Sequence, residues 1–240
     1  MVEGNAVSNW TILCDFDGTI ALDDTTDTLL ERFGRPGWEK LETDWREGRI
    51  NSHDCMAGQI ALLDMSRREL DAHLAARAID PAFGAFVEAT QRSGVPLEVL
   101  SDGLDYAIRT ILHRYGFDWL PITANRLEST GARDWRLGFP NASPSCRVGS
   151  GTCKCVRAES SRAGRRRVLL IGDGASDFCV AEASDFVFAK GKLIAHCRAN
   201  DIPHAAIDGF ADALALLPRL LAGTLGVPDV TATLPSAALA

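Results

Sequence analysis

Two aspartates one residue apart, Asp15 and Asp17, stand at the end of a short apolar run and are followed at once by Gly18 and Thr19. In such a pair, one carboxylate can attack a phosphorus atom while the other handles the proton. The pattern therefore indicates phosphate chemistry through an aspartyl intermediate. An isolated Asp-x-Asp-Gly is also typical of a solvated acidic turn, so the rest of the chain has to decide between these interpretations.

Other chemically apt side chains follow apolar runs further along the chain: Ser101 after residues 95–100, Lys154 at the start of a predicted helix, and Asp173 and Asp177 after residues 167–171. The carboxyl ends of parallel strands meet at one edge of a sheet, where open α/β sheets bind their ligands. We therefore expect these groups to converge with Asp15 and Asp17, which chance placement would rarely achieve.

The elements that must position these groups alternate along the sequence. Short apolar runs typical of buried strands alternate with helical patterns, and residues 122–139 favour antiparallel strands at a sheet edge; the runs lie at 11–14, 95–100, 167–171, 186–188 and 204–206. This order predicts an α/β fold, a Rossmann-like doubly wound and mostly parallel sheet.

The segment after the first strand does not return to the sheet at once. Residues 25–78 have helical periodicity, interrupted by glycine and proline, which predicts an all-helical insert. We expect a core domain of residues 1–22 and 82–225 and a helical cap domain of residues 23–81. Residues 226–240, rich in Ala, Thr, Pro and Leu without a period, are predicted to form a flexible tail.

Composition limits the partners. The 240 residues are 46% hydrophobic, enough for one sizeable core with an inserted subdomain. A net charge of −7 argues against a nucleic-acid partner, and the basic run at 162–167 is interrupted and precedes a strand. No apolar segment is long enough to span a membrane and no export signal is visible. We expect a cytoplasmic protein without a membrane partner, either a monomer or a homodimer.

Three cysteines, Cys146, Cys153 and Cys155, share one loop, which raises the question of a zinc or redox site. Only three thiols are available there and no Cys-x-x-Cys pair occurs. We therefore favour a role in shaping the loop around Lys154.

Together, residues 15–19, Ser101, Lys154 and residues 172–177 resemble the four motifs of the haloacid dehalogenase superfamily of phosphatases. The helical insert resembles the cap of the subgroup that contains phosphoserine phosphatase. Other stretches resemble, more narrowly, the phosphatases of methionine salvage that act on 2-hydroxy-3-keto-5-methylthiopentenyl-1-phosphate; they are residues 101–106, 139–146, 151–153 and 188–198. Asp102 departs from this pattern, because those enzymes typically have glycine there, and the cysteine loop looks shorter.

This resemblance implies a role for each motif. Asp15 would be the nucleophile, and Asp17 would protonate the leaving oxygen and then activate water. Lys154 would bridge the nucleophile and the phosphoryl group. The phosphate would be bound by this lysine together with residues after the first two strands: Gly18, Thr19, Ser101, Asp102 and Gly103. Mg²⁺ would be held by Asp15, the main-chain carbonyl of Asp17 and Asp173, with Asp177 supporting the site.

The leaving-group site is less determined. Asp24 stands nine residues after Asp15, where phosphoserine phosphatases carry a glutamate, so it could contact the leaving group or cap the first helix of the insert. Arg46, Arg49 and His53 are polar residues of the insert for which a solvated position is favoured.

The leading functional hypothesis is a Mg²⁺-dependent phosphatase acting on a small sugar-like or enol phosphate, with the methylthiopentenyl phosphate as the first candidate. One alternative substrate is phosphoserine or a phosphoryl amine alcohol. An alternative of another class is a phospho-accepting signalling domain or a metal-binding domain without turnover, against which Asp17 and the insert weigh.

Overall fold

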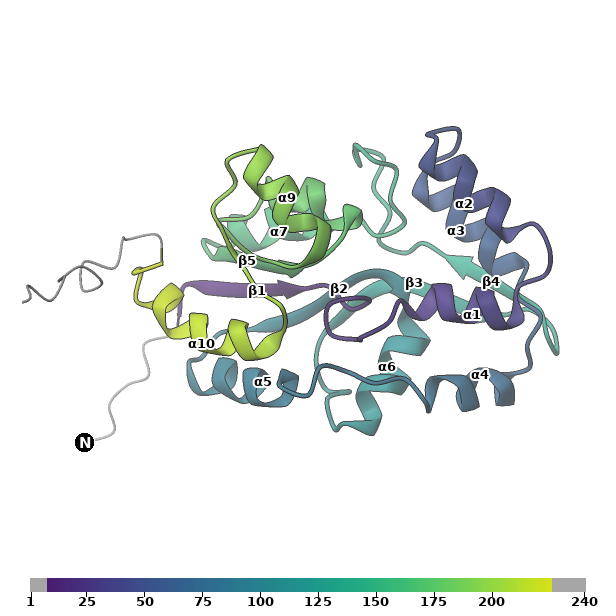
Figure 1. The fold of residues 1–240 in the computed structure, drawn as a ribbon, viewed down its shortest axis with the longest axis horizontal. Helices are drawn as coiled ribbons and strands as arrows, with labels where there is room; N and C mark the ends of the chain where they lie inside the picture. The colour runs from purple at the N-terminus through teal and green to yellow at the C-terminus, as the bar shows by residue number, and fades with distance from the viewer. Residues whose placement is uncertain (1–7, 226–240) are drawn as a thin grey trace, which may run out of the picture.

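The computed structural model describes residues 8–225, so the predicted tail at 226–240 lies outside the described residues. Within this range one seven-stranded sheet has the order β4-β3-β2-β1-β5-β6-β7 (Figure 1). The strands are β1 (Trp10–Cys14), β2 (Leu97–Leu104), β3 (Ile122–Ser129), β4 (Trp135–Gly138), β5 (Arg167–Gly172), β6 (Phe186–Ala189) and β7 (His204–Ala206). All neighbours pair in parallel except β3 and β4, which form an antiparallel hairpin at the edge. The predicted doubly wound α/β fold is confirmed.

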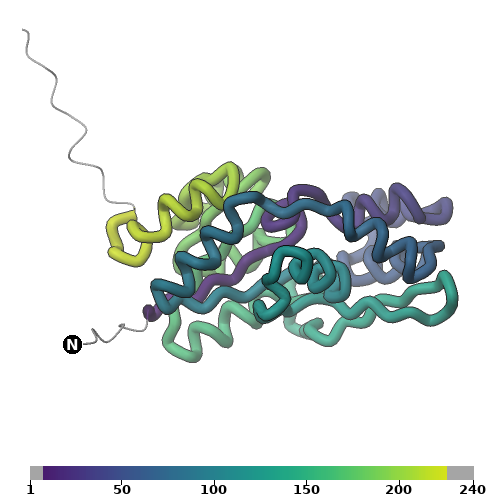
Figure 2. Tube along the Cα trace, turned by 90° about the horizontal axis from the view of Figure 1, so that it is seen from below, coloured from purple at the N-terminus to yellow at the C-terminus, as the bar shows by residue number. Residues whose placement is uncertain are grey.

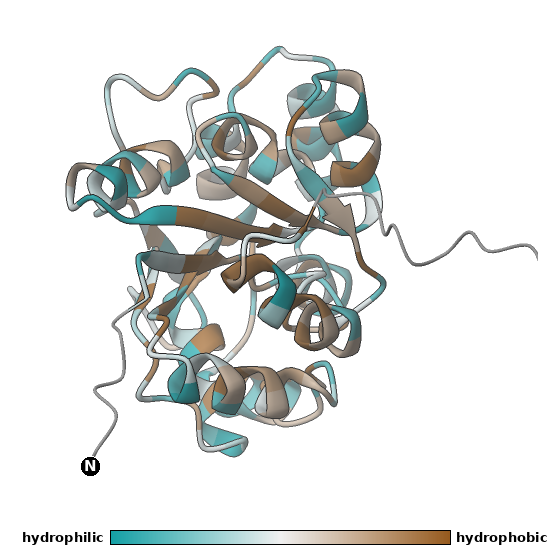
Figure 3. Cartoon of the chain, turned by 90° about the vertical axis from the view of Figure 1, so that its left-hand side faces the viewer, coloured by the Kyte–Doolittle hydropathy of each residue, from teal (hydrophilic) through white to brown (hydrophobic). Residues whose placement is uncertain are grey.

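Helices cover both faces of the sheet (Figure 1). One face carries α5 (Phe83–Arg92), α6 (Asp105–Arg114) and α10 (Phe210–Leu221), of which α5 and α10 lie side by side in Figure 2. The other face carries α7 (Lys154–Ala163), α8 (Phe178–Ala181) and α9 (Gly191–Ala199). The central strands are strongly apolar between these layers (Figure 3). These strands are apolar because both of their faces are buried. Ile12 and Leu13, successive residues of β1, belong to different apolar clusters on opposite faces of the sheet.

The register of β1 places the candidate site at one edge of the sheet. Cys14, the last residue of β1, pairs with Val99 on one side and Ile171 on the other. Asp15 therefore follows level with the end of β5 and with the middle of β2, just before Ser101. Because β1 lies between β2 and β5, the connections leave it in opposite directions, which opens a crevice at this point.

The helical insert consists of four helices between β1 and α5: α1 (Thr25–Phe33), α2 (Trp38–Arg46), α3 (Ser52–Ala61) and α4 (Arg67–Leu74). Local sequence defines their starts. Asp24 and Asn51 cap α1 and α3, and Ser66 with Glu69 forms a capping box on α4. The division of the chain into core and cap domains remains a prediction, although the insert is helical as expected.

The β3–β4 hairpin ties the insert to the sheet. Trp135 is buried and its indole N–H donates to the Met65 carbonyl at 2.8 Å. Arg133 forms ion pairs with Asp64 and Glu69 in the connection to α4 and in α4 itself. These contacts attach the segment around the start of α4 to the hairpin at the edge of the sheet. By contrast, α2 has no buried residue.

Two details differ from a simple strand-and-loop expectation. The strand β2 continues through Ser101, Asp102 and Gly103, and its register against β3 shifts between Leu100 and Leu104. Such an irregularity changes the direction of side chains at the end of a strand.

None of the helices within residues 8–225 is long and apolar enough to cross a membrane.

Candidate active site

A buried ion pair lies at the centre of the candidate site. Lys154, the first residue of α7, is 2% exposed, and its Nζ lies 2.9 Å from Asp15 Oδ1 and 2.7 Å from Asp177 Oδ1. Burial opposes the charge of this lysine, but the carboxylates of Asp15, Asp177 and Asp102 outweigh it and raise its pKa. The ammonium therefore stays charged beside Asp15, which is the state needed to draw a phosphoryl group toward that carboxylate.

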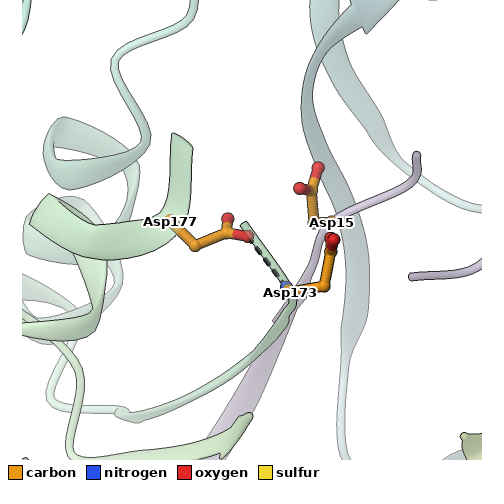
Figure 4. Close-up of side chains that lie close together, drawn as sticks. All are labelled: Asp15, Asp173 and Asp177. Carbon is orange, nitrogen blue, oxygen red and sulfur yellow. Dashed lines mark hydrogen bonds between the residues drawn. The ribbon is translucent and has the colours of Figure 1, made fainter. Parts of the chain in front are cut away.

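Three carboxylates, two of which contact this lysine, lie close together at the strand ends (Figure 4). Oxygens of Asp15, Asp173 and Asp177 lie within 4.8 Å of one another. Burial and the repulsion of Asp177 raise the pKa of Asp15, and burial also raises that of Asp173. One ammonium does not balance three carboxylates in a buried site, so the donor set fits a hard divalent cation with oxygen ligands.

The hydrogen bonds distinguish the three aspartates. Asp177 is completely buried, and both its oxygens have protein donors: Lys154 at Oδ1 and the main-chain N–H of Asp173 at Oδ2 (Figure 4). Asp173 Oδ1 accepts from the Thr19 hydroxyl at 3.0 Å. Asp177 therefore orients the loop that carries Asp173, whereas Asp15 and Asp173 each have protein partners at Oδ1 and could offer Oδ2 to a cation.

Asp17 lies apart from this cluster, on the side of the insert. Its Oδ1 accepts the main-chain N–H of Thr25, the first residue of α1, at 2.9 Å. Burial and the negative charge of Asp24 raise the pKa of Asp17 to about 7. A carboxyl group with this pKa can exist in both protonation states near neutral pH, as a general acid that later becomes a base must.

Gly103 determines where the Asp17 carboxylate can lie. A Cβ on Gly103 would come within 2.5 Å of Asp17 Oδ2, and the Gly103 N–H donates to Ser101 Oγ at 2.9 Å. Ser101 is 1% exposed and lines the cavity described below. The end of β2 thus brings Gly103 directly against Asp17, with Ser101 hydrogen-bonded to the Gly103 main chain.

Asp102 turns away from this contact toward the cysteine loop. Its carboxylate accepts from the Ser150 hydroxyl and from the main-chain N–H of Thr152 at 2.8 Å. Burial raises its pKa. The residue that replaces the expected glycine therefore anchors the loop that leads into Lys154, and a contribution to phosphate binding would come from its main chain.

Gly18 and Thr19 form the turn after Asp17. Gly18 has φ of +70°, and a Cβ there would lie 2.7 Å from Asp173 Oδ2, so both conformation and space require glycine. Sequence reasoning missed Lys190, whose Nζ donates to the Gly18 carbonyl at 2.9 Å. The signal was available, because Lys190 follows β6 at the same edge of the sheet.

A cavity of about 500 Å³ connects the strand ends with the insert. Its floor includes Asp15, Asp17, Ser101 and Asp173, and its upper wall comes from α1, α2 and α3. Asp24 lines this cavity and also caps α1, since its Oδ1 accepts from Asp27 N–H at 2.9 Å. Both interpretations of Asp24 are therefore compatible with its position.

The other polar residues predicted in the insert differ in whether they line the cavity. Arg46 lines the cavity, but its Nε pairs with Glu42 at 2.9 Å and its side chain is 71% exposed. Arg49 pairs with Asp44, and the ring of His53 packs on Phe139 at a centroid distance of 3.8 Å. Neither Arg49 nor His53 lines the cavity.

The three cysteines are free thiols, but Cys155 lies in α7 rather than in the predicted loop, because the helix already begins at Lys154. Cys153 is buried at the start of α7, and its N–H donates to the Asn141 carbonyl at 3.0 Å. Cys146 Sγ accepts from the Ser150 N–H at 3.3 Å, while Cys155 is half-buried beside α8. The contacts of Cys146 and Cys153 stabilise the loop before Lys154.

Comparison with known proteins bears on this site. Residues 12–182 match the haloacid dehalogenase-like hydrolase family. A 2-hydroxy-3-keto-5-methylthiopentenyl-1-phosphate phosphatase from Geobacillus thermodenitrificans is 30% identical, covering 87% of this chain and 96% of that protein. The polyol phosphate phosphatase PYP1 of Saccharomyces cerevisiae is 28% identical, covering 91% of this chain and 97% of that protein.

Among solved structures, a phospho-aspartyl intermediate analogue of phosphoserine phosphatase superposes with a TM-score of 0.66. It shares 19% sequence identity, over 86% of this chain and 97% of that one. At this identity the likeness concerns the fold.

Proposed function

The chain belongs to the haloacid dehalogenase-like hydrolases, and from this we propose that it hydrolyses small-molecule phosphomonoesters through a phosphoaspartate formed on Asp15. The observation that carries the proposal is the contact of Asp15 with the buried Lys154, next to Asp173 and Asp177. This arrangement offers a nucleophile, a fixed positive charge and a cation site at the end of one strand.

Asp15 attacks phosphorus, and the bond from phosphorus to the ester oxygen breaks. Asp17 donates its proton to that oxygen, and then takes a proton from the water that hydrolyses the phosphoaspartate. Lys154, the Ser101 hydroxyl and the main-chain N–H groups of the turn at Gly18 and Thr19 bind the phosphoryl oxygens. The Gly103 main chain supports Ser101 and leaves room for Asp17.

We propose that the divalent cation is Mg²⁺, held by Asp15, Asp173 and the main-chain carbonyl of Asp17, with Asp177 supporting Asp173. When bound, it would offset the negative charge shared by the nucleophile and the phosphate. The unbalanced carboxylates of the cluster support this assignment.

The substrate we propose is a sugar-like or enol phosphate, with 2-hydroxy-3-keto-5-methylthiopentenyl-1-phosphate as the first candidate. Support comes from the names of the relatives, which include both that phosphatase and a polyol phosphate phosphatase. We further propose a cytoplasmic enzyme that works as a monomer or homodimer, without nucleic acid.

The test is phosphate release from purified protein with a panel of small phosphate esters, including the methylthiopentenyl enol phosphate and phosphoserine. Each ester is assayed with Mg²⁺ and again with excess chelator. We expect turnover that disappears with chelator and returns when Mg²⁺ is added back. A long-lived phosphoaspartate without phosphate release would instead favour the signalling alternative.

A further inference from the structure

The wall that the insert contributes to the cavity is acidic. Of the described residues that line the cavity, those from α1, α2 and the turn before α1 include three carboxylates and one guanidinium: Asp24, Asp27, Glu42 and Arg46. The guanidinium is already paired, because Arg46 Nε lies 2.9 Å from Glu42 Oε1. Glu42 Oε2 also accepts from Gln59 Nε2 at 3.2 Å. The insert side of the cavity therefore presents no unpaired positive charge to a ligand, and the lysine of the lining, Lys192, belongs to α9, outside the insert.

The carboxylates of this wall affect one another. Burial, followed by the charges of Asp24 and Glu42, raises the pKa of Asp27 to about 6, and burial raises the pKa of Asp24. Asp24 also uses one oxygen to cap α1. Asp27, which lies at the first turn of that helix, therefore remains as an acceptor facing the cavity in a region of negative potential.

A second, independent feature of the cavity lining is a hydroxyl group on α1. Thr26 lines the cavity and is 8% exposed, and its hydroxyl has no hydrogen-bond partner among the described residues. A buried hydroxyl without a partner costs free energy, which a ligand can recover by hydrogen bonding to it. Trp45 and Met56 add apolar surface to the same wall. Carboxylates, a hydroxyl and an aromatic ring suit a polyhydroxylated carbon chain.

Resting on the proposed phosphatase function, we infer that Asp27, Glu42 and Thr26 select uncharged, hydroxyl-rich leaving groups and reject leaving groups that carry a carboxylate. Hydroxyl groups donate hydrogen bonds to the carboxylates of the wall. A substrate carboxylate at this wall of the insert would meet negative charge, and the guanidinium there, that of Arg46, is already paired with Glu42.

The test compares two pairs of phosphate esters that differ in one carboxylate: glycerol 3-phosphate with 3-phosphoglycerate, and phosphoethanolamine with phosphoserine. We expect kcat/KM to be at least about tenfold higher for the member without the carboxylate in each pair, and highest for glycerol 3-phosphate. Equal values within the pairs would overturn the inference but leave the phosphatase function standing. No Mg²⁺-dependent hydrolysis of any ester would overturn both.

Variants identify the residues responsible. Asp27→Asn and Glu42→Gln should each lower the selectivity within the pairs by about threefold or more, because each removes one negative charge and keeps the side-chain shape. Glu39→Gln is the matched control, since Glu39 lies on α2 with Glu42 but does not line the cavity. A structural defect would lower both members of a pair together and leave their ratio unchanged. Unchanged ratios in both variants would overturn the assignment.

The ethanolamine ester separates hydroxyl recognition from recognition of positive charge. If phosphoethanolamine exceeds glycerol 3-phosphate, and Asp27→Asn abolishes that advantage, the wall binds an ammonium group and the polyol assignment is wrong. If Thr26→Val lowers kcat/KM for glycerol 3-phosphate more than for p-nitrophenyl phosphate, the hydroxyl acts on the leaving group, as inferred. Equal losses for both esters would contradict that role.

Discussion

The two walls of the cavity are built in different ways. At the strand ends, polar side chains are buried and fully engaged: Lys154 is 2% exposed, Asp177 is completely buried, and each contacts at least one other member of the site. On the helical insert, Asp24, Asp27 and Arg46 line the cavity, and the Arg46 side chain is 71% exposed. Fixed charges suit a phosphoryl group that is the same in every substrate, whereas an open wall suits a leaving group that varies.

The difference also appears in how each wall is supported. The carboxylates at the strand ends rest on the central strands, which are buried on both faces. The insert packs Leu29, Ile60 and Leu70 into the apolar cluster on one face of the sheet and contacts the β3–β4 hairpin, but α2 has no buried residue. Changes at the strand ends should therefore affect turnover of every ester, and changes in the insert should affect selectivity or stability.

The largest expected effect is at Asp15. Asp15→Asn keeps the shape of the side chain but removes the nucleophile, so turnover of every ester should fall by about 10³-fold or more. Phosphate release and thermal unfolding measure the two consequences, and the fold should persist. Asp23→Asn, an exposed aspartate outside the cavity, is the control. Near-native turnover in Asp15→Asn would remove the nucleophile assignment.

Asp17→Asn should have the next largest effect, and its size should depend on the leaving group. For alkyl esters, loss of the general acid should lower kcat/KM by about 10²- to 10⁴-fold. For p-nitrophenyl phosphate the loss should be smaller, because p-nitrophenolate leaves without a proton. Equal losses for both esters would argue that Asp17 has another role.

The raised pKa of Asp17 predicts a pH profile. With a pKa of about 7, the carboxyl group is protonated below pH 7 and loses its proton above it. Because the acid form is needed to expel an alkoxide, kcat/KM for alkyl esters should fall as pH rises through about 7. Asp24→Asn removes a negative charge that raises this pKa, so the fall should move to lower pH. An unshifted profile would show that Asp24 does not tune Asp17.

Gly103→Ala tests the contact between β2 and Asp17 without altering any reacting group. The new Cβ would lie 2.5 Å from Asp17 Oδ2, so the carboxylate must move. A displacement of this kind should lower turnover by up to about 100-fold for alkyl esters. Gly138→Ala is the control, because the nearest atom to its Cβ is 3.6 Å away. Similar kinetics in the two variants would contradict the positioning argument.

The smallest effect on activity is expected at Trp135. Trp135→Phe leaves the Met65 carbonyl without its donor, which should lower the free energy of unfolding by about 1–3 kcal/mol. Chemical denaturation measures this loss. Turnover should stay within about threefold of the native rate, because the strand ends do not depend on this contact. A loss of turnover as large as that of Gly103→Ala would show that the insert positions the reacting groups.

Much of the fold followed from the sequence. The apolar runs at 167–171, 186–188 and 204–206 lie in β5, β6 and β7, and the antiparallel pair expected at 122–139 forms β3 and β4. The continuation of β2 through Gly103 was not visible, because a strand irregularity depends on pairing with β3, a contact between distant residues. Lys190 was not predicted because it lies outside the four motifs, although it directly follows β6.

The sequence by itself determined which groups gather at one sheet edge. Apolar runs must be buried as parallel strands, and the polar residues that follow them must then share that edge, so Asp15, Ser101 and Asp173 could be grouped in advance. Only the tertiary structure decided how these groups divide the work. Burial raises the pKa of Asp17. A hydrogen bond from Ser150 directs the Asp102 carboxylate toward the cysteine loop, and the packing of the insert places Asp27 and Glu42 on the cavity wall. Desolvation and contacts across the fold have no signature in local sequence, because they depend on which distant residues exclude water from each group.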